Sequence, residues 1–314
     1  MRRFLRILFF CIIPFKLLPI IVAEELRIAT YNLNNYLVTD RYVDGRWRPS
    51  YPKPEREKTI IRQIIKDVSP DVLVLQEMGS INFLHELRAD MAREGIHYDY
   101  LEHMEGADQN RYLAVLSKCA PKAVLKHKDL NFKYFEGREV VKRGMLEMTF
   151  ELTSGTNFQL FAVHLKSRYT DKKEDLQSSL RRVREAEACR NRIVERTHDL
   201  GANKYLIVGD FNDHPSSATM RRLYRRGKLE IGALVPAADS RGELWTYFYE
   251  KESRYESVDG FVASSAFMAM IKSRCAKIVD SLGALTASDH RMVYLDLIEP
   301  APAQVKKIRH YAGR

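Results

Sequence analysis

Several polar side chains stand where an apolar run of the chain stops. The clearest run, residues 205–208 (Tyr-Leu-Ile-Val), ends in Gly209 and is followed at once by Asp210, Asn212 and Asp213. A carboxylate can take a proton from an attacking water, and a carboxamide can donate hydrogen bonds to phosphoryl oxygens. Side by side at the end of a buried strand, these groups have the chemistry that cleavage of a phosphate ester needs.

The same pattern recurs at other apolar runs of the chain. One such residue alone is more often a helix cap, a solvated turn residue or a satisfied core histidine than part of a site. Their recurrence at the ends of successive strands is what predicts a shared site at one edge of the fold. In chain order these residues are Asn32, Asn34, Glu77, His164, Asp259, Asp289 and His290.

The elements that must position these residues are strands and helices in alternation. Period-two and short apolar runs predict strands over 26–33, 71–77, 112–118, 146–152, 158–166, 204–211, 257–263 and 291–297. Helical spacing predicts helices over 54–68, 81–94, 171–200 and 215–226. The turn at 153–157 makes its two flanking strands antiparallel, whereas other strands follow helices. These mixed connections favour an α/β fold of two packed sheets with helices outside.

The sequence predicts one domain followed by a short tail. No linker rich in Pro, Gly or Ser interrupts residues 24–299, so they are expected to form one domain. Residues 300–314 form a basic tail. Three cysteines beyond the N-terminal segment (Cys119, Cys189, Cys275) are too few for a disulfide framework, although one disulfide stays possible.

Six short motifs, in chain order, give the pattern a family likeness. TYN, LQE, VHLKS, GDFND, SVDGF and SDHRMVYLDL resemble the endonuclease/exonuclease/phosphatase superfamily. That group includes deoxyribonucleases, apurinic-site endonucleases, neutral sphingomyelinases and inositol polyphosphate 5-phosphatases. The resemblance covers residues 26–297. It implies a four-layer α/β sandwich, two mixed β-sheets flanked by helices, with the site where the strand ends meet.

The resemblance also implies a metal site. Glu77 matches the metal carboxylate of the family, and Asn32 and Asp289 are expected to support the metal or its water shell. Hard oxygen ligands of this kind suit Mg²⁺, or Mn²⁺ in its place.

Five further residues match catalytic positions of the family. Asp210 would orient or deprotonate the attacking water, and Asn212 would donate to the phosphoryl oxygens. His290 would face the scissile phosphate, with Asp259 fixing its tautomer and raising its pKa. His164 matches a second phosphate-facing histidine of deoxyribonuclease-like and sphingomyelinase-like members.

Three more residues are expected on the substrate side of the site. Arg111 and Lys166 are candidate phosphate contacts. Asn34 stands where apurinic-site enzymes often carry an acid, which favours a substrate contact over a second metal ligand. Those enzymes also have a tyrosine-containing motif where this chain has VHLKS, so His164 points away from that branch.

The charge of the chain is uneven. Positive charges exceed negative ones by ten; four of them lie in the first 23 residues, which contain no acid, and the remainder carries an excess of six. That mild excess suits an anionic substrate without requiring one. Residues 1–23 join an arginine-rich start to an interrupted apolar run and are expected to be a cleaved export signal, or alternatively an uncleaved anchor.

Three segments could select the substrate. Arg221, Arg222, Arg225 and Arg226 would form a basic face if the helix spans 215–226, either along a phosphate backbone or simply in solvent. The segments 40–54 and 239–255 combine arginine with tryptophan and tyrosine. Such loops suit nucleobases or lipid headgroups, unless they are packed by their own aromatic side chains.

The sequence therefore predicts an exported, divalent-metal-dependent phosphoesterase that hydrolyses phosphodiesters, with a nuclease as first choice. A sphingomyelinase-like lipid phosphodiesterase and an inositol-phosphate phosphatase are the alternatives within the enzyme class. A non-catalytic binding domain on the same fold is the alternative outside it. The expected partner is an anionic phosphoester, DNA or RNA among the candidates, with no stable protein partner and a monomeric chain.

Overall fold

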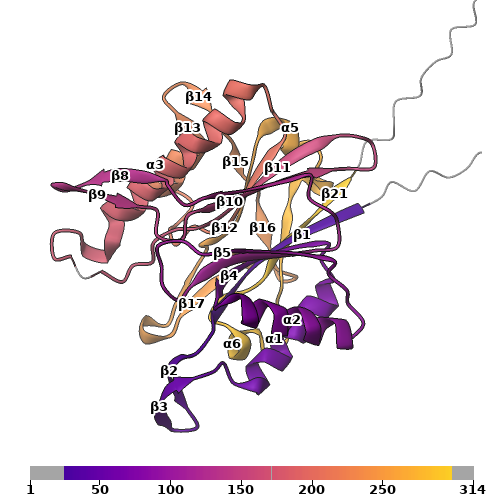
Figure 1. Ribbon diagram of the computed structural model, residues 1–314, viewed down its shortest axis with the longest axis vertical. Helices are drawn as coiled ribbons and strands as arrows, with labels where there is room; N and C mark the ends of the chain where they lie inside the picture. The colour runs from indigo at the N-terminus through magenta and orange to yellow at the C-terminus, as the bar shows by residue number, and fades with distance from the viewer. Residues whose placement is uncertain (1–24, 171, 299–314) are drawn as a thin grey trace, which may run out of the picture.

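The computed structural model describes residues 25–170 and 172–298. Two large β-sheets lie face to face in its centre (Figure 1). The first has seven strands in the order β16 (Ala237–Ala238), β20 (Ala276–Ile278), β21 (Val293–Ile298), β1 (Glu25–Tyr36), β4 (Val72–Met78), β6 (Tyr112–Ser117) and β5 (Tyr100–Met104). The second has six in the order β15 (Ala233–Leu234), β19 (Asp259–Ala263), β12 (Tyr205–Asp210), β11 (Asn157–His164), β10 (Met145–Glu151) and β7 (Ala123–His127).

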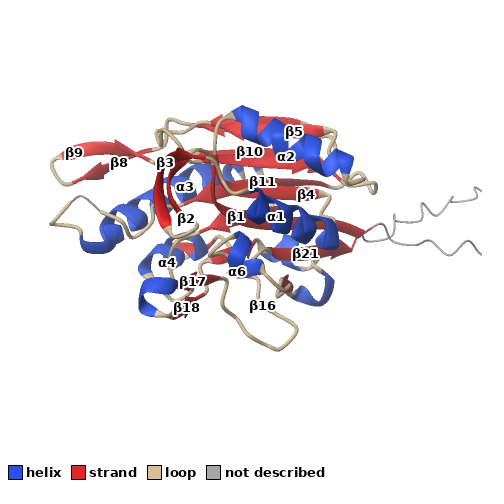
Figure 2. Cartoon of the chain, turned by 90° about the horizontal axis from the view of Figure 1, so that it is seen from below, coloured by secondary structure: helices blue, strands red, loops and turns tan. Residues whose placement is uncertain are grey.

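Helices and small hairpins surround the two sheets (Figure 2). The helices are α1 (Glu55–Val68), α2 (Ile81–Arg93), α3 (Ser179–Arg196), α4 (Ala218–Tyr224), α5 (Ser265–Met268) and α6 (Ala284–Ala287). Short 3₁₀ turns cover Leu176–Ser178, His198–Leu200, Glu250–Glu252 and Lys272–Arg274. Four hairpins pair β2 (Thr39–Val43) with β3 (Arg46–Tyr51), β8 (Asn131–Tyr134) with β9 (Gly137–Val140), β13 (Arg225–Arg226) with β14 (Leu229–Glu230), and β17 (Tyr247–Tyr249) with β18 (Arg254–Glu256).

Three hydrophobic clusters show the four layers. One fills the space between the sheets and includes Val74, Leu146 and Val208. A second joins the outer face of the seven-stranded sheet to α1 and α2, through residues such as Ile61. The third joins the outer face of the six-stranded sheet to α3 and α4, through residues such as Ile193. The predicted sandwich of two sheets between helices is therefore confirmed.

Strand direction is mixed, as the sequence predicted. β1 pairs antiparallel with β21 and parallel with β4, and β11 pairs antiparallel with β10 and parallel with β12. Because parallel neighbours end at the same edge of a sheet, the polar residues that follow β1 and β4 come out together, and so do those that follow β11 and β12. The ends of the described domain lie at the opposite edge, where Glu25 pairs with Ile298.

Two predicted helices are shorter than their sequence spacing suggested. The helix expected over 171–200 is regular only in α3, because Gln177 and Ser178 adopt left-handed backbone angles and Asp175 accepts hydrogen bonds from the amides of Leu180 and Arg181. The helix expected over 215–226 ends at Tyr224, and Arg225–Arg226 turns into β13 ahead of Gly227. The prediction of one helical face carrying four arginines is therefore wrong.

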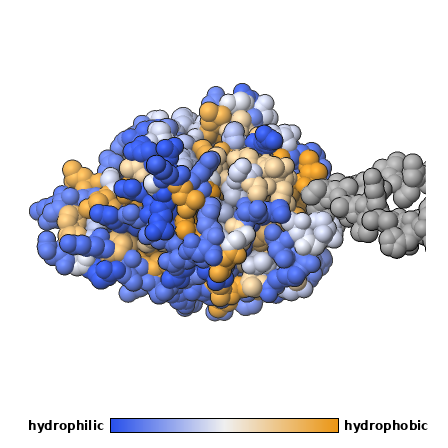
Figure 3. All heavy atoms as spheres, turned by 90° about the horizontal axis from the view of Figure 1, so that it is seen from above, coloured by the Kyte–Doolittle hydropathy of each residue, from blue (hydrophilic) through white to orange (hydrophobic). Residues whose placement is uncertain are grey.

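Both segments proposed as substrate selectors contain hairpins. Residues 40–54 hold most of β2 and β3, and residues 239–255 hold β17 and most of β18. Most of their residues are exposed or half-buried, so the apolar signal of a core strand is missing. The face of the molecule shown in Figure 3 is largely hydrophilic, with apolar residues in separate small groups.

Candidate active site

Strand register places three of the predicted residues in one row. His164 on β11 pairs with Asp210 on β12, and Asp210 pairs with Asp259 on β19. Residues that are directly opposite each other in neighbouring strands point to the same face of a sheet. This face looks toward the other sheet, where Asn32 on β1 pairs with Gln76 on β4.

A glycine allows the two central strands to approach. Gly209 has a φ of 142°, and a Cβ built at this position would lie 1.9 Å from the carbonyl oxygen of Val163. No side chain fits in that space, so β11 and β12 could not keep this pairing with any other residue at 209. The glycine of the GDFND motif is thereby explained by the close contact that sets His164 beside Asp210.

The Asp210 carboxylate is buried and surrounded by donors. Its Oδ1 accepts from the backbone N–H of Asn212 at 2.8 Å, and its Oδ2 accepts from Asn32 Nδ2 and Asn212 Nδ2, both at 3.0 Å. Asn212 Nδ2 also donates to the carbonyl of Leu165 at 3.0 Å. The Asn212 amide, predicted to donate to a phosphoryl oxygen, thus holds Asp210 in place. The bond from Asn32 joins the two sheets at the site.

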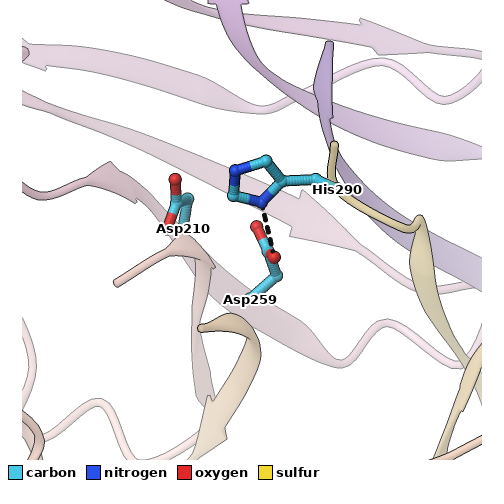
Figure 4. Close-up of side chains that lie close together, drawn as sticks. All are labelled: Asp210, Asp259 and His290. Atoms are coloured by element: carbon cyan, nitrogen blue, oxygen red, sulfur yellow. Dashed lines mark hydrogen bonds and ion pairs between the residues drawn. The ribbon is translucent and has the colours of Figure 1, made fainter. Parts of the chain in front are cut away.

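His290 and Asp259 form a buried pair. His290 Nδ1 lies 2.8 Å from Asp259 Oδ2, a contact that orients the imidazole, and Asp210 lies beside them (Figure 4). Ligand atoms of all three residues lie within 4.8 Å of one another. Such a group could enclose a metal ion, but a protonated imidazole has no lone pair to give to one.

The pKa values of His290 and Asp210 are both raised above their ordinary values. Burial lowers the pKa of His290, but the Asp259 carboxylate and then Asp210 outweigh burial and raise it to about 10. Burial, followed by the charge of Asp259, raises the pKa of Asp210 to about 7. Near neutral pH the site therefore has a carboxylate ready to take a proton and an imidazolium ready to stabilise negative charge.

His164 is neutral. Burial and the nearby positive charges of Arg143, His290 and Arg111 hold its pKa well below the usual value. Its Nε2 lies 3.5 Å from Asp210 Oδ2. Among the described residues its Nδ1 has no hydrogen-bond partner. The structure thus places His164 against the Asp210 carboxylate, within the row of residues that the sequence predicted.

Glu77 lies at the opposite side of the site, at the end of β4. Its backbone has a left-handed φ of 59°, at the irregularity of β4 where the register with β1 and β6 shifts before Met78. Its Oε2 accepts from the backbone N–H of Asn35 at 2.9 Å, and Arg111 Nε lies 3.7 Å from the same oxygen. Arg111 in turn donates to Asn35 Oδ1 at 2.8 Å. The Glu77 carboxylate is thus held in one orientation at the sheet edge.

The residues present fit a magnesium-like ion. Burial raises the pKa of the Asp289 carboxyl, His290 lowers it, and the negative charge of Glu77 raises it. A cation bound by both carboxylates would offset the effect of Glu77. Two carboxylates with the amide of Asn32 nearby make the hard oxygen donor set that Mg²⁺ and Mn²⁺ accept.

The three predicted substrate contacts have different surroundings. Arg111 lies beside Glu77, and Asn34 donates its backbone N–H to Asn32 Oδ1 at 3.0 Å. The ammonium of Lys166 donates instead to the carbonyls of Ser167 and Tyr169. Burial, with Arg143 as the next cause, lowers the pKa of Lys166 to about 8. In this structure the Lys166 ammonium therefore supports the loop after β11.

Three residues of the site had no clear signal in the sequence. Asn35 holds both Glu77 and Arg111. Arg143 is 5% exposed, and among the described residues its Nη1 has no hydrogen-bond partner. Tyr247 packs its ring on His290, with centroids 4.6 Å apart, because residues 246–248 pair with 289–291 along the backbone. Only the aromatic character of the segment 239–255 hinted at Tyr247.

Comparison with known proteins agrees with the α/β sandwich fold described above. A sequence model of the endonuclease/exonuclease/phosphatase family matches residues 29–290. No curated protein sequence matches the chain.

Within the described residues, no helix is long and apolar enough to cross a membrane.

Solved structures share this fold at low sequence identity. A family protein from Bacteroides vulgatus is 16% identical, with a TM-score of 0.59 over 88% of this chain and 100% of that one. Sphingomyelinase C from Streptomyces griseocarneus is 15% identical, with a TM-score of 0.58 over 87% and 99%. A variant beta toxin from Staphylococcus aureus with bound magnesium ions is 14% identical, with a TM-score of 0.57 over 88% and 100%. This chain belongs to the endonuclease/exonuclease/phosphatase family, whose members are generally hydrolases of phosphoesters.

Proposed function

We propose that this protein is a divalent-metal-dependent phosphodiesterase that cleaves nucleic acid. The observation that carries the proposal is the convergence of a buried carboxylate, Asp210, with an imidazolium, His290, held by Asp259. The donors around Asp210 and the hydrogen bond that His290 donates to Asp259 fix both groups before any substrate arrives.

The proposed reaction is a one-step attack by water on phosphorus. Asp210 takes a proton from the water as its oxygen bonds to phosphorus and the bond from phosphorus to the leaving oxygen breaks. His290 stabilises the negative charge that develops on the phosphoryl oxygens, and Asp259 keeps its imidazole charged and oriented. Asn32 and Asn212 hold Asp210 so that a lone pair faces the water.

The metal is proposed to sit at Glu77 and Asp289, with Asn32 in support. When bound, a divalent ion acts as a Lewis acid that polarises a phosphoryl oxygen and offsets its charge. The magnesium ions in the Staphylococcus aureus beta toxin support this choice of ion. Asn35 and Arg111 keep the Glu77 carboxylate at the sheet edge where the ion is needed.

Two cavities support a diester substrate over a monoester. One, of about 580 Å³, reaches Asp289 and Asn34; the other, of about 410 Å³, reaches Asn212. Tyr247 and Tyr249 line both cavities and stand between them. A phosphate at Asp210 and His290 would therefore have room for a substituent on each side, as a phosphodiester requires.

The linings favour nucleic acid over lipid. The cavity near Asn212 presents Tyr169 and Tyr249 and the arginines Arg168 and Arg254, both paired with Glu256, and its single aliphatic residue is Val258. Aromatic rings stack on bases, and the outer N–H groups of paired guanidiniums can still contact sugar–phosphate, whereas acyl chains would take these ion pairs out of water. The basic charge of the chain agrees with a polyanionic substrate.

We also propose that the chain is exported and acts as a monomer. Both proposals rest on the sequence: residues 1–23 and 300–314, the export segment and the basic tail, lie outside the described residues. The charged n-region and the apolar run that follows it are typical of a cleaved signal.

A substrate panel tests the proposed function. Bis-p-nitrophenyl phosphate, plasmid DNA, RNA, sphingomyelin and inositol phosphates are incubated with the protein in Mg²⁺, Mn²⁺ or EDTA, beside the variant His290→Ala. We expect metal-dependent hydrolysis of the small diester and of nucleic acid, reduced at least about a hundredfold in the variant. Hydrolysis of sphingomyelin alone would establish the lipid alternative, and hydrolysis of nothing would establish a non-catalytic domain.

A further inference from the structure

The cavity of about 580 Å³ beside Asp289 is built from two hairpins that are far apart in the sequence. Tyr42 and Trp47 come from the β2–β3 hairpin, and Tyr247 and Tyr249 come from β17. The volume lies within the range of pockets that bind small molecules. The cavity is continuous with the candidate metal site, because Asp289 and Asn34 also line it.

Its walls present aromatic rings that the fold leaves accessible. Trp47 is 71% exposed and Tyr42 64% exposed, and their rings meet edge to face with centroids 6.0 Å apart. On the β17 side the rings of Tyr247 and Tyr249 are nearly parallel, with centroids 6.4 Å apart. Large aromatic side chains gain most by burial, so two of them left in solvent beside a cavity indicate a ligand that covers their faces.

The β2–β3 hairpin is fixed to the active site. Arg41 donates through Nη2 to the carbonyls of Asn35 and Leu37 and through Nε to the carbonyl of Tyr51. Lys53, 2% exposed, donates to the carbonyl of Asn34 at 3.1 Å. The hairpin is thus anchored to the segment whose Asn35 orients Glu77, and the aromatic wall is pre-organised relative to the metal site.

The lining identifies the chemistry of the ligand. Most of the other lining residues are charged or polar, among them Asp40, Arg41, Glu250 and Lys251, and the aliphatic ones are Val43 and Leu285. A nucleobase has two flat faces for the rings and a polar edge for these groups. An acyl chain would bury the same groups without hydrogen bonds, which is costly. A base in a duplex has its faces covered by its neighbours, so only an unpaired base can enter.

We propose that this cavity binds one unpaired nucleobase of a single-stranded nucleic acid whose scissile phosphate lies at Asp210 and His290. The proposal rests on the proposed function and makes it specific: the protein prefers single strands to duplexes. Stacking of a base on an aromatic side chain changes affinity by about 5- to 150-fold when the ring is removed. We expect a change of about tenfold for Trp47.

The test measures binding without cleavage, in the Asp210→Asn background. The ligands are a twelve-residue thymidine strand, an abasic strand of the same length and charge, and a duplex of that length. The protein has two tryptophans, and Trp47→Phe assigns the quenching of fluorescence to Trp47. We expect the thymidine strand to quench Trp47 and to bind about tenfold more tightly than the abasic strand.

The variant Trp47→Ala should bring the ratio of the two affinities close to one. The control Tyr100→Ala removes an aromatic side chain, 41% exposed, from β5 outside the cavity and should keep the full ratio. Equal affinity for the thymidine and abasic strands would overturn the proposal, and so would a duplex that binds as tightly as the single strand. A response of Trp47 to sphingomyelin vesicles and not to the strand would also overturn it, in favour of a lipid surface.

The two proposals fail in different ways. If the unmodified protein hydrolyses bis-p-nitrophenyl phosphate with Mg²⁺ but shows no preference for bases, the cavity inference alone is wrong. If it hydrolyses no phosphodiester at all, the proposed function is wrong.

Discussion

The substitution Asp210→Asn separates what this carboxylate contributes to catalysis from what it costs the fold. The side chain keeps its shape but loses its charge and its ability to accept a proton. Proton transfer by a positioned base contributes about 10²- to 10⁴-fold to a rate. We therefore expect kcat to fall at least about a hundredfold, measured on a small phosphodiester with saturating Mg²⁺.

The same variant should be more stable than the parent at alkaline pH. Because burial and Asp259 raise the pKa of Asp210 from 3.8 to about 7, its ionised form costs the fold about 4 kcal/mol at pH 8. Asparagine removes that cost, but its amide nitrogen then faces the donors of Asn32 and Asn212, a conflict of about 1 to 3 kcal/mol. The net gain in the free energy of unfolding is about 1 to 3 kcal/mol.

The gain should depend on pH in a defined window. Below pH 3.8 Asp210 is protonated in both states and costs nothing. Between 3.8 and 7 the folded state keeps a proton that the unfolded state loses, so the parent loses stability as pH rises through this window. From pH 7 downward the advantage of the variant should shrink by about 1.4 kcal/mol per pH unit and disappear between about pH 6.3 and about pH 5.

Urea unfolding followed by circular dichroism, in EDTA at pH 8, 6.5 and 5, measures these differences. The matched control is Asp67→Asn, which removes a charge from an exposed position of α1 and should change stability by less than about 0.5 kcal/mol at each pH. A variant less stable than the parent at pH 8 would refute the reasoning about the buried charge. So would a difference in the free energy of unfolding that does not change with pH. A kcat within tenfold of the parent value would show that Asp210 is not the general base.

Three other predictions address the metal, the basic surface and the N-terminus. Glu77→Gln removes one of two facing carboxylate charges and should lower the apparent affinity for Mg²⁺ at least about tenfold; an unchanged Mg²⁺ dependence of hydrolysis would mean that Glu77 is not a ligand. Arg222 and Arg226 lie near enough to Arg190 to lower its pKa, after burial, so a basic cluster persists without the predicted helix. Replacing Arg222 and Arg226 with Gln should reduce the log–log salt slope of DNA binding by about 0.7 to 0.9 for each lost phosphate contact, and an identical slope would mark them as solvent-facing only. Mass spectrometry of exported protein should find an N-terminus at or near Glu24, whereas full-length protein in the cytosolic fraction would contradict export.

The central strands were predictable because their signal is local. Buried strands such as β4 and β12 read as short apolar runs, and each ends where a polar residue begins. The mixed connections favoured two packed sheets with helices outside, and the family resemblance implied the four-layer sandwich. The hairpins escaped detection because their residues are polar, aromatic and half-exposed, with no apolar period to read. The error at Arg225–Arg226 arose from helical spacing counted past Tyr224, where Gly227 reverses the chain.

The sequence identified residues of the candidate site but not the contacts between their side chains. The sequence placed Asp210, Asp259 and His290 at strand ends, but their contact depends on register between strands that lie about 30 to 80 residues apart in the chain. The roles assigned to them remain predictions. Asn35 and Arg143 act through tertiary contacts that leave no local pattern, and Asn212 was expected to face substrate because a motif does not show where an amide donates.

The pairing of Glu25 with Ile298 has a practical consequence. The two ends of the described domain are neighbours in the sheet, whereas Asn32, seven residues along β1, lies at the active site, about 24 Å away along the strand. A short linker could therefore join these ends, with new ends opened at the exposed β8–β9 turn near Phe135, to give a circular permutant with the same strand order in space. For the same reason, attaching the domain to a bead or a sensor surface through either end would present the catalytic edge to solution.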